Sequence, residues 1–136
     1  MNSMHFVGMD VHKKVIAYCV KTRAGHKRAE GVIAATRESL DAWLAERQQP
    51  FVLAMEATLF TWWIYDYLVP HARQIKVAHP LMLKAIIAGK RKSDRIDAEK
   101  IADLLRVNLL PECYMAPSAI RDLRRVLRYR SLLVRE

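Results

Sequence analysis

The first third of the chain carries short apolar runs of the kind that form strands. Residues 5–11 (HFVGMDV) and 14–22 (KVIAYCVKT) are rich in β-formers and are separated by a polar turn, so they predict a hairpin. A third strand is expected around residues 27–33, after the turn signal at Gly25. The chain therefore begins as an antiparallel meander.

Beyond this meander, helical and strand patterns alternate. Residues 51–56 (FVLAME) and 74–80 (QIKVAHP) predict a fourth and a fifth strand, the latter ending at Pro80. Apolar residues at helical spacing predict helices over residues 37–47, about 61–71, 81–88, a segment with Ile101, Leu104 and Leu105 on one face, and a last amphipathic segment after Pro117.

This order predicts a mixed α/β sheet of five strands with flanking helices, whose later connections are parallel crossovers. We expect a domain over residues 1–110. Residues 111–136 then form a linker and the start of a long, arginine-rich helix, which we interpret as a truncated coiled coil. Because the helical pattern reaches Glu136 without a cap or a breaker, we interpret the chain as a fragment.

The composition adds a polyanionic partner to this picture. The 136 residues include 23 basic and 14 acidic side chains, a formal charge of +9, which favours nucleic acid. Cys19 and Cys113 are too few for a disulfide framework or a zinc site. No apolar run is long enough to span a membrane and the beginning does not resemble a secretory signal, so we expect a cytoplasmic protein with no membrane partner.

Four carboxylates carry the candidate chemistry. Asp10 lies inside an apolar strand and Glu56 ends another, and a charge in either place is costly unless something compensates it. If the two strands are parallel neighbours, both carboxylates meet at one edge of the sheet. Asp94 and Asp97 are three residues apart, so we expect them to project from one face of their helix. The four acids together predict a site for Mg²⁺ or Mn²⁺, with two ions.

Each acid also has a purely structural explanation. A lone Asp in a strand is more often an edge residue, and Glu56 would serve as a solvated strand end. Asp94 and Asp97 would serve as a helix cap and its first-turn acid. The metal site is favoured only because one α/β topology would gather all four.

Three segments resemble a known family. The order VGMDVHK (7–13), MEAT (55–58) and KSDRIDA (92–98) is similar to that of the DEDD transposases of bacterial insertion sequences and the related Piv-type invertases. The run LRRVLRYR (123–130) resembles the start of the helical segment that follows their catalytic domain. The chain departs from the family at Leu59, Thr61 and Ser93, which puts the turn after Glu56 in doubt.

The resemblance implies a ribonuclease-H-like, RuvC-type fold in which Asp10, Glu56, Asp94 and Asp97 are the catalytic, metal-binding acids. It also implies DNA recombination guided by a bridge RNA, and a serine nucleophile supplied by a second domain, so that this fragment is inactive alone. We expect a homodimer or a higher homo-oligomer. The residues expected to bind nucleic acid are Lys13, Lys90, Arg91, Lys92, Arg95, Arg121, Arg124, Arg125 and Arg128.

Three other functions stay open from the sequence. A stand-alone nuclease of the junction-resolving type shares the acids but needs no serine. A catalytically silent nucleic-acid-binding module is the second. An ATP-binding domain of the sugar-kinase or actin kind also begins with an acid on its first strand, but it requires a Gly- and Thr-rich phosphate loop that VHKK does not provide.

Overall fold

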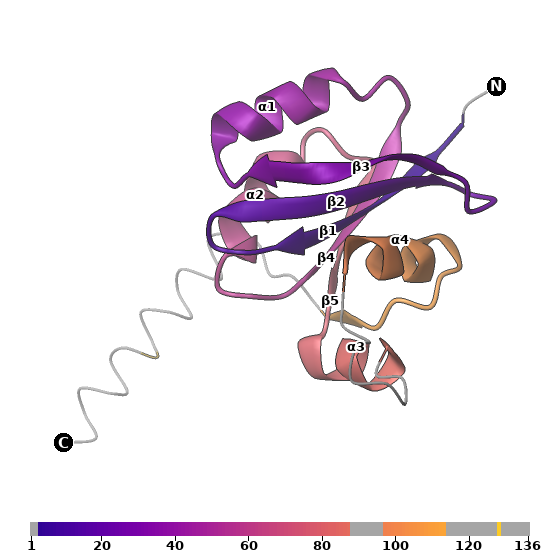
Figure 1. The fold of residues 1–136 in the computed structure, drawn as a ribbon. Helices are drawn as coiled ribbons and strands as arrows, with labels where there is room; N and C mark the ends of the chain where they lie inside the picture. Colours follow the sequence, from indigo (N-terminus) through magenta and orange to yellow (C-terminus); the bar gives the residue numbers. More distant parts are fainter. Residues whose placement is uncertain (1–2, 88–96, 114–127, 129–136) are drawn as a thin grey trace.

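The computed structural model describes residues 3–87, 97–113 and Arg128 (Figure 1). Strands and helices follow one another as β1 (His5–Val11), β2 (Val15–Thr22), β3 (Lys27–Ala34), α1 (Arg37–Ala45), β4 (Phe51–Glu56), α2 (Thr61–Leu68), β5 (Gln74–Ala78), α3 (Pro80–Ile87), α4 (Ala98–Arg106) and β6 (Glu112–Cys113).

The strands form one mixed sheet in the order β3-β2-β1-β4-β5-β6. The meander β1-β2-β3 is antiparallel, whereas β4 lies parallel to β1 on its other side and β5 lies parallel to β4. Crossover connections through α1 and α2 produce this change of direction, because parallel neighbours cannot be joined by a tight turn. Three parallel strands, β1, β4 and β5, therefore end at the same edge of the sheet.

Helices α1 and α2 cover one face of the sheet. Leu40 and Trp43 of α1 and Ile64 and Leu68 of α2 are buried there, against the inward side chains of the strands. Trp43 packs edge-on against Phe51, with ring centroids 5.4 Å apart. Burying a side chain of this size contributes about 1.5–3 kcal/mol. The N-cap Thr36, whose Oγ1 accepts the backbone N–H of Ser39, fixes where α1 begins.

Helices α3 and α4 lie on the opposite face (Figure 1). Ile101 and Leu105 of α4 and Leu83 of α3 pack there against Phe6 and Ala54. The alternation along β1 explains the division, because Phe6 and Gly8 face α4 while Val7 and Met9 face α1 and α2.

Gly8 permits a very close approach of α4 to the sheet. A Cβ atom added at this position would lie 2.1 Å from the carbonyl oxygen of Ala98 and 2.5 Å from the backbone nitrogen of Ala102. The backbone of α4 therefore rests directly on β1, and only a residue without a side chain is compatible with this packing.

Charged side chains attach α4 to β2. The ammonium of Lys21, only 7% exposed, donates to both carboxylate oxygens of Asp103 at 2.8 and 2.9 Å. It also lies 2.9 Å from Oε2 of Glu99, and Nε of Arg106 donates to Asp103 at 2.9 Å. This group, Lys21, Glu99, Asp103 and Arg106, is called the Lys21 network below.

Helix α4 ends in a left-handed residue that turns the chain back toward the sheet. Asn108 has a φ of 60°, its N–H bonds to the carbonyl of Leu105, and the N–H of Leu109 bonds to that of Leu104. This pair of bonds satisfies the last carbonyls of the helix. The chain then forms β6 antiparallel to β5.

The five expected strands are all present, and the expectation of only five is wrong by one. The additional strand, β6, has two residues, too few for a hydrophobic period to reveal it. The sheet thus continues to Cys113, past the expected domain end at residue 110. The division between residues 1–110 and 111–136 stays a prediction, since beyond Cys113 the structure describes Arg128 alone. In the described part of the chain, no helix is long and apolar enough to cross a membrane.

Candidate metal centre

Asp10 and Glu56 lie on neighbouring parallel strands. Strands β1 and β4 pair in a register that places Met9 beside Met55, so the next residues, Asp10 and Glu56, are also level. Side chains alternate along a strand, and Gly8 and Ala54, two residues earlier, belong to the face that carries α3 and α4. Both carboxylates therefore belong to that face, at the edge where the parallel strands end. The expected meeting of these two acids is confirmed.

The carboxylate of Asp10 is partly withdrawn from solvent. Its side chain is 22% exposed, and Oδ2 lies 3.1 Å from Nε2 of His12, whose ring is 60% exposed. His12 is two residues along the chain, just past the end of β1. The ring thus orients one oxygen of Asp10, at the end of the site next to the β1–β2 turn.

The pKa of Glu56 reports on its surroundings. Burial raises this pKa above the ordinary value for a glutamate, and the negative charge of Asp10 raises it further. The positive charges of Lys84 on α3 and of His12 act in the opposite direction. The net result is a carboxylate whose ionised form is disfavoured, as expected where two acids share a site without enough compensating charge.

A threonine pair holds the turn that follows Glu56. The buried hydroxyl of Thr61 donates to the backbone carbonyl of Glu56 at 2.7 Å and accepts the N–H of Thr58 at 3.0 Å. The backbone N–H of Ala57 also donates to the carbonyl of Ala78 on β5, at 3.0 Å. Thr61, one of the departures from the family pattern, thus fixes the turn whose form the sequence left in doubt.

Asp97 is the N-cap of α4 and does not lie on the helix, which begins at Ala98. Its Oδ1 accepts the backbone N–H of Lys100 at 2.8 Å. The expectation that Asp97 projects from a helix face is therefore wrong, because the residue has extended backbone angles and its side chain satisfies a free N–H of the first turn. Asp94, its expected companion, lies outside the described residues.

The start of α4 nevertheless reaches the part of the sheet that carries Asp10. Ala98, the residue after Asp97, packs on Gly8, two residues before Asp10 on the same face of β1. Within residues 3–87 and 97–113, however, no three His, Cys, Asp or Glu side chains are close enough together to hold a metal ion. The structure joins Asp10 with Glu56 and does not bring Asp97 to them as a third ligand.

Of the basic residues expected to bind nucleic acid, the structure describes Lys13 and Arg128. Lys13 is exposed in the turn after β1, close in the chain to Asp10, and Arg128 is exposed as well. The others, Lys90, Arg91, Lys92, Arg95, Arg121, Arg124 and Arg125, lie outside the described residues. The sequence reasoning missed Lys84, whose charge acts on Glu56. Its exposed position on α3 has no local signal, because only the packing of α3 brings it near β4.

The site can be compared with known families. The model of a family described as Transposase, that of the IS110-type DEDD transposases, matches residues 7–136. No curated protein matches the chain significantly.

Proposed function

Because the chain belongs to the IS110-type DEDD transposases, we propose that it forms the ribonuclease-H-like catalytic domain of a DNA recombinase whose acids hold divalent metal ions. The observation that carries the proposal is the pair of level carboxylates, Asp10 and Glu56, at the end of two parallel strands. Ligands of open α/β sheets bind at this edge. The order of the strands, three antiparallel and then two parallel, also agrees with a ribonuclease-H-like fold.

The chemistry of these side chains fits a hard divalent cation. Two carboxylates lie side by side at this edge, and burial, followed by the charge of Asp10, raises the pKa of Glu56. Oxygen donors of this type suit Mg²⁺ or Mn²⁺. We propose Asp10, Glu56, Asp94 and Asp97 as the ligands. Capping α4 occupies only one oxygen of Asp97, and a carboxylate has two, so capping and metal binding are compatible.

Two bound cations would supply Lewis-acid polarisation of a DNA phosphodiester. The residues of this chain would orient the cations and the DNA. Asp10, with its Oδ2 beside His12, lies near the end of β1, and Glu56 ends β4, just before the turn that Thr61 holds; both would provide ligands from paired strands. Lys13, the exposed residue after His12 in the β1–β2 turn, is proposed to contact a phosphate of the DNA.

We propose that the nucleophile is a serine of a second domain and that a bridge RNA guides the choice of DNA. The two described serines support an external nucleophile. Ser39 is bonded to Thr36 at the start of α1, and Ser3 precedes β1, at the edge of the sheet away from Asp10. The residue 111–136 segment is proposed as the start of the helical link to that domain, with a homodimer or a larger homo-oligomer as the assembly.

The metal proposal is tested by titrating Mg²⁺ and Mn²⁺ while following thermal unfolding. A ligand present at 100 times its Kd stabilises a protein by about 2.7 kcal/mol. We expect this stabilisation in the natural sequence and its loss in Asp10→Asn and Glu56→Gln. Asp94→Asn and Asp97→Asn are expected to weaken it, and Asn at position 97 still caps the helix, so that only the charge is removed.

Glu38→Gln is the matched control, since Glu38 is an exposed acid in the first turn of α1, on the other face of the sheet. This variant should retain the full metal-dependent stabilisation. Unchanged metal affinity in both Asp10→Asn and Glu56→Gln would show that the acid pair is not the metal site.

A further inference from the structure

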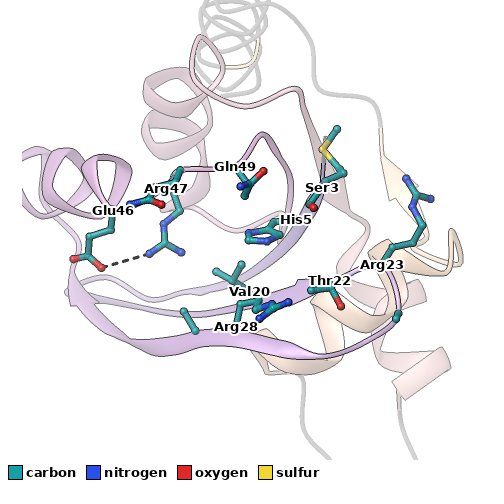
Figure 2. A pocket seen from close by; sticks show the side chains of 13 residues that line it. Ser3, His5, Val20, Thr22, Arg23, Arg28, Glu46, Arg47 and Gln49 are labelled. Carbon is teal, nitrogen blue, oxygen red and sulfur yellow. Dashed lines mark hydrogen bonds and ion pairs between the residues drawn. The ribbon is translucent and has the colours of Figure 1, made fainter. Parts of the chain in front are cut away.

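A basic cavity lies at the edge of the sheet away from the acids. It has a volume of about 640 Å³ and is built from the beginning of β1, the β2–β3 turn, β3 and the loop between α1 and β4 (Figure 2). Its polar lining residues include His5, Arg23, Arg28, Glu46, Arg47 and Gln49.

Positive charge dominates this cavity. Arg28 and Arg47 bring two guanidinium groups to its lining, whereas Glu46 is the single acid among the described lining residues. Arg23 also lines the cavity, but its guanidinium group stacks on the Phe6 ring, with Cζ 5.2 Å from the ring centroid. The pKa of His5 is lowered first by burial and then by the charges of Arg28 and Arg47. Both guanidinium groups therefore act on the same imidazole, and Figure 2 shows Arg28 and Arg47 approaching His5 from different sides.

Arg47 is held in place before any ligand arrives. Its side chain is 11% exposed, and its Cζ lies 4.7 Å from the ring centroid of Trp43 and 5.9 Å from that of Tyr18. The contact from Nη2 to Glu46 is long, 3.4 Å, and Nε has no hydrogen-bond partner among the described residues. The charge of this stacked guanidinium group is therefore weakly paired, which favours binding of an anion. The planar fork of N–H donors suits a phosphate.

The cavity is separate from the acid pair in two ways. His5 and Asp10 are five positions apart on β1, a distance of about 17 Å along a strand. The odd-numbered residues of β1 face α1 and the even-numbered ones face α4, so the two sites also belong to opposite faces of the sheet. A phosphate bound in the cavity therefore belongs to a different stretch of nucleic acid from the one at the acids.

We propose that this cavity binds a phosphodiester group of a nucleic-acid strand, which Arg28 and Arg47 hold. Its polar lining and its excess of guanidinium groups select an anion. The formal charge of +9 makes a polyanion the natural source of that anion. The domain would then grip nucleic acid at two places, one at each end of β1, and the second grip needs no metal.

The experiment uses the 136-residue chain in a buffer with a chelator, so that binding at the acid pair does not contribute. Fluorescence anisotropy of a labelled 20-nucleotide DNA strand and of an RNA of the same sequence gives Kd over a series of NaCl concentrations. Loss of one phosphate contact with a single strand reduces the slope of log Kd against log salt by about 0.7. We expect this change in Arg28→Gln, together with a Kd about 5–10 times higher.

Arg37→Gln is the matched control, because Arg37 is an exposed arginine at the start of α1 and does not line the cavity. It should change the Kd less than about twofold, as expected for a charge that contacts no phosphate. Equal losses in Arg28→Gln and Arg37→Gln would overturn the proposal in favour of a diffuse basic surface. Whichever of the two probes, DNA or RNA, has the lower Kd is the nucleic acid that the cavity prefers.

A second measurement avoids any loss of stability in the variants. Inorganic phosphate is titrated into the isotope-labelled natural sequence, and NMR follows the His5 ring and the Nε–H of Arg47. Both signals should shift together and saturate, and they should do so equally in an Asp10→Asn, Glu56→Gln background. Failure of both signals to respond would overturn the cavity site while leaving the metal proposal intact.

Discussion

Two groups of charged side chains lie on the sheet face that carries α3 and α4. In one group the ionised form of a carboxylate is favoured, and in the other it is disfavoured. In the Lys21 network, hydrogen bonds and opposite charges lower the pKa of Asp103, although burial alone would raise it. At the acid pair, burial and Asp10 raise the pKa of Glu56. The first arrangement favours the ionised carboxylate and holds α4 on β2. The second disfavours it, which is the condition that a bound cation relieves.

The Lys21 network stabilises the folded state, whereas the charge repulsion between Asp10 and Glu56 destabilises it. Removing a partner from a buried, satisfied ion pair is costly, because the remaining charge stays buried. Neutralising one of two like charges has the opposite effect. The two regions therefore respond to substitution with opposite signs, and four experiments, ordered by the expected size of the effect, test this.

The largest effect is expected from Gly8→Val, because α4, which carries Asp103 and Glu99 of the Lys21 network, rests on Gly8. The added Cβ would meet the backbone of Ala98 and Ala102, which cannot move aside as a flexible side chain would. We expect a loss of about 3 kcal/mol or more of unfolding free energy in urea. Gly31→Ala is the control, since the nearest atoms to its Cβ would be those of the Tyr18 side chain, at 3.1–3.3 Å, rather than backbone. Equal losses in the two variants would contradict the direct contact of α4 with β1.

Lys21→Met comes next. It leaves Asp103 and Glu99 without their shared cation, but both acids are more than a third exposed, so solvent compensates part of the loss. We expect a destabilisation of about 1–3 kcal/mol in urea unfolding. Lys27→Met is the matched control, because Lys27 also pairs with Glu99 but is itself exposed, and its loss should be much smaller. If Lys21→Met left the free energy of unfolding unchanged, the network would not be what holds α4 on β2.

Glu56→Gln is expected to change stability in the opposite direction. In a buffer with a chelator, this substitution removes a partly buried charge that Asp10 repels, at nearly constant volume. We expect a gain of about 0.5 kcal/mol, limited by solvent screening. Urea unfolding at pH 7 measures it, with Glu38→Gln as a near-neutral control. A clear loss of stability would mean that the charge of Glu56 is already satisfied within the fold.

The dependence on pH sharpens the same contrast. The pKa of Asp103 is lowered in the folded state, so the stability it contributes is present above its ordinary pKa and is lost as the pH falls through the lowered value. The pKa of Glu56 is raised, so its cost is absent below the ordinary value and develops as the pH rises through the raised one.

The difference in unfolding free energy between the natural sequence and Lys21→Met should therefore grow from pH 3 to pH 7. The difference between Glu56→Gln and the natural sequence should grow over the same range, but in favour of the variant. If the natural sequence became the more stable protein in both comparisons as the pH rises, the two regions would not have opposite electrostatic effects on stability.

The sequence alone predicted the five long strands, the crossover helices α1 and α2 and the neighbouring acids Asp10 and Glu56. These features are local, because a strand that is buried on both faces reads as an apolar run, and a carboxylate inside such a run stands out. The same reasoning placed Asp97 on a helix face. A few residues of difference in where α4 begins turned it into the N-cap.

Tertiary structure alone decided which charges meet. Lys21 and Asp103 are 82 residues apart, and nothing near either one predicts the other. The cavity of His5, Arg28 and Arg47 likewise joins three separate segments. Local patterns record whether a side chain is buried, whereas the balance of charge at a site depends on partners that only the packed sheet and helices bring within reach. For this reason the sequence could name Asp10 and Glu56, while the fold determined that the ionised form of Glu56 is disfavoured and that of Asp103, beside Lys21, is favoured.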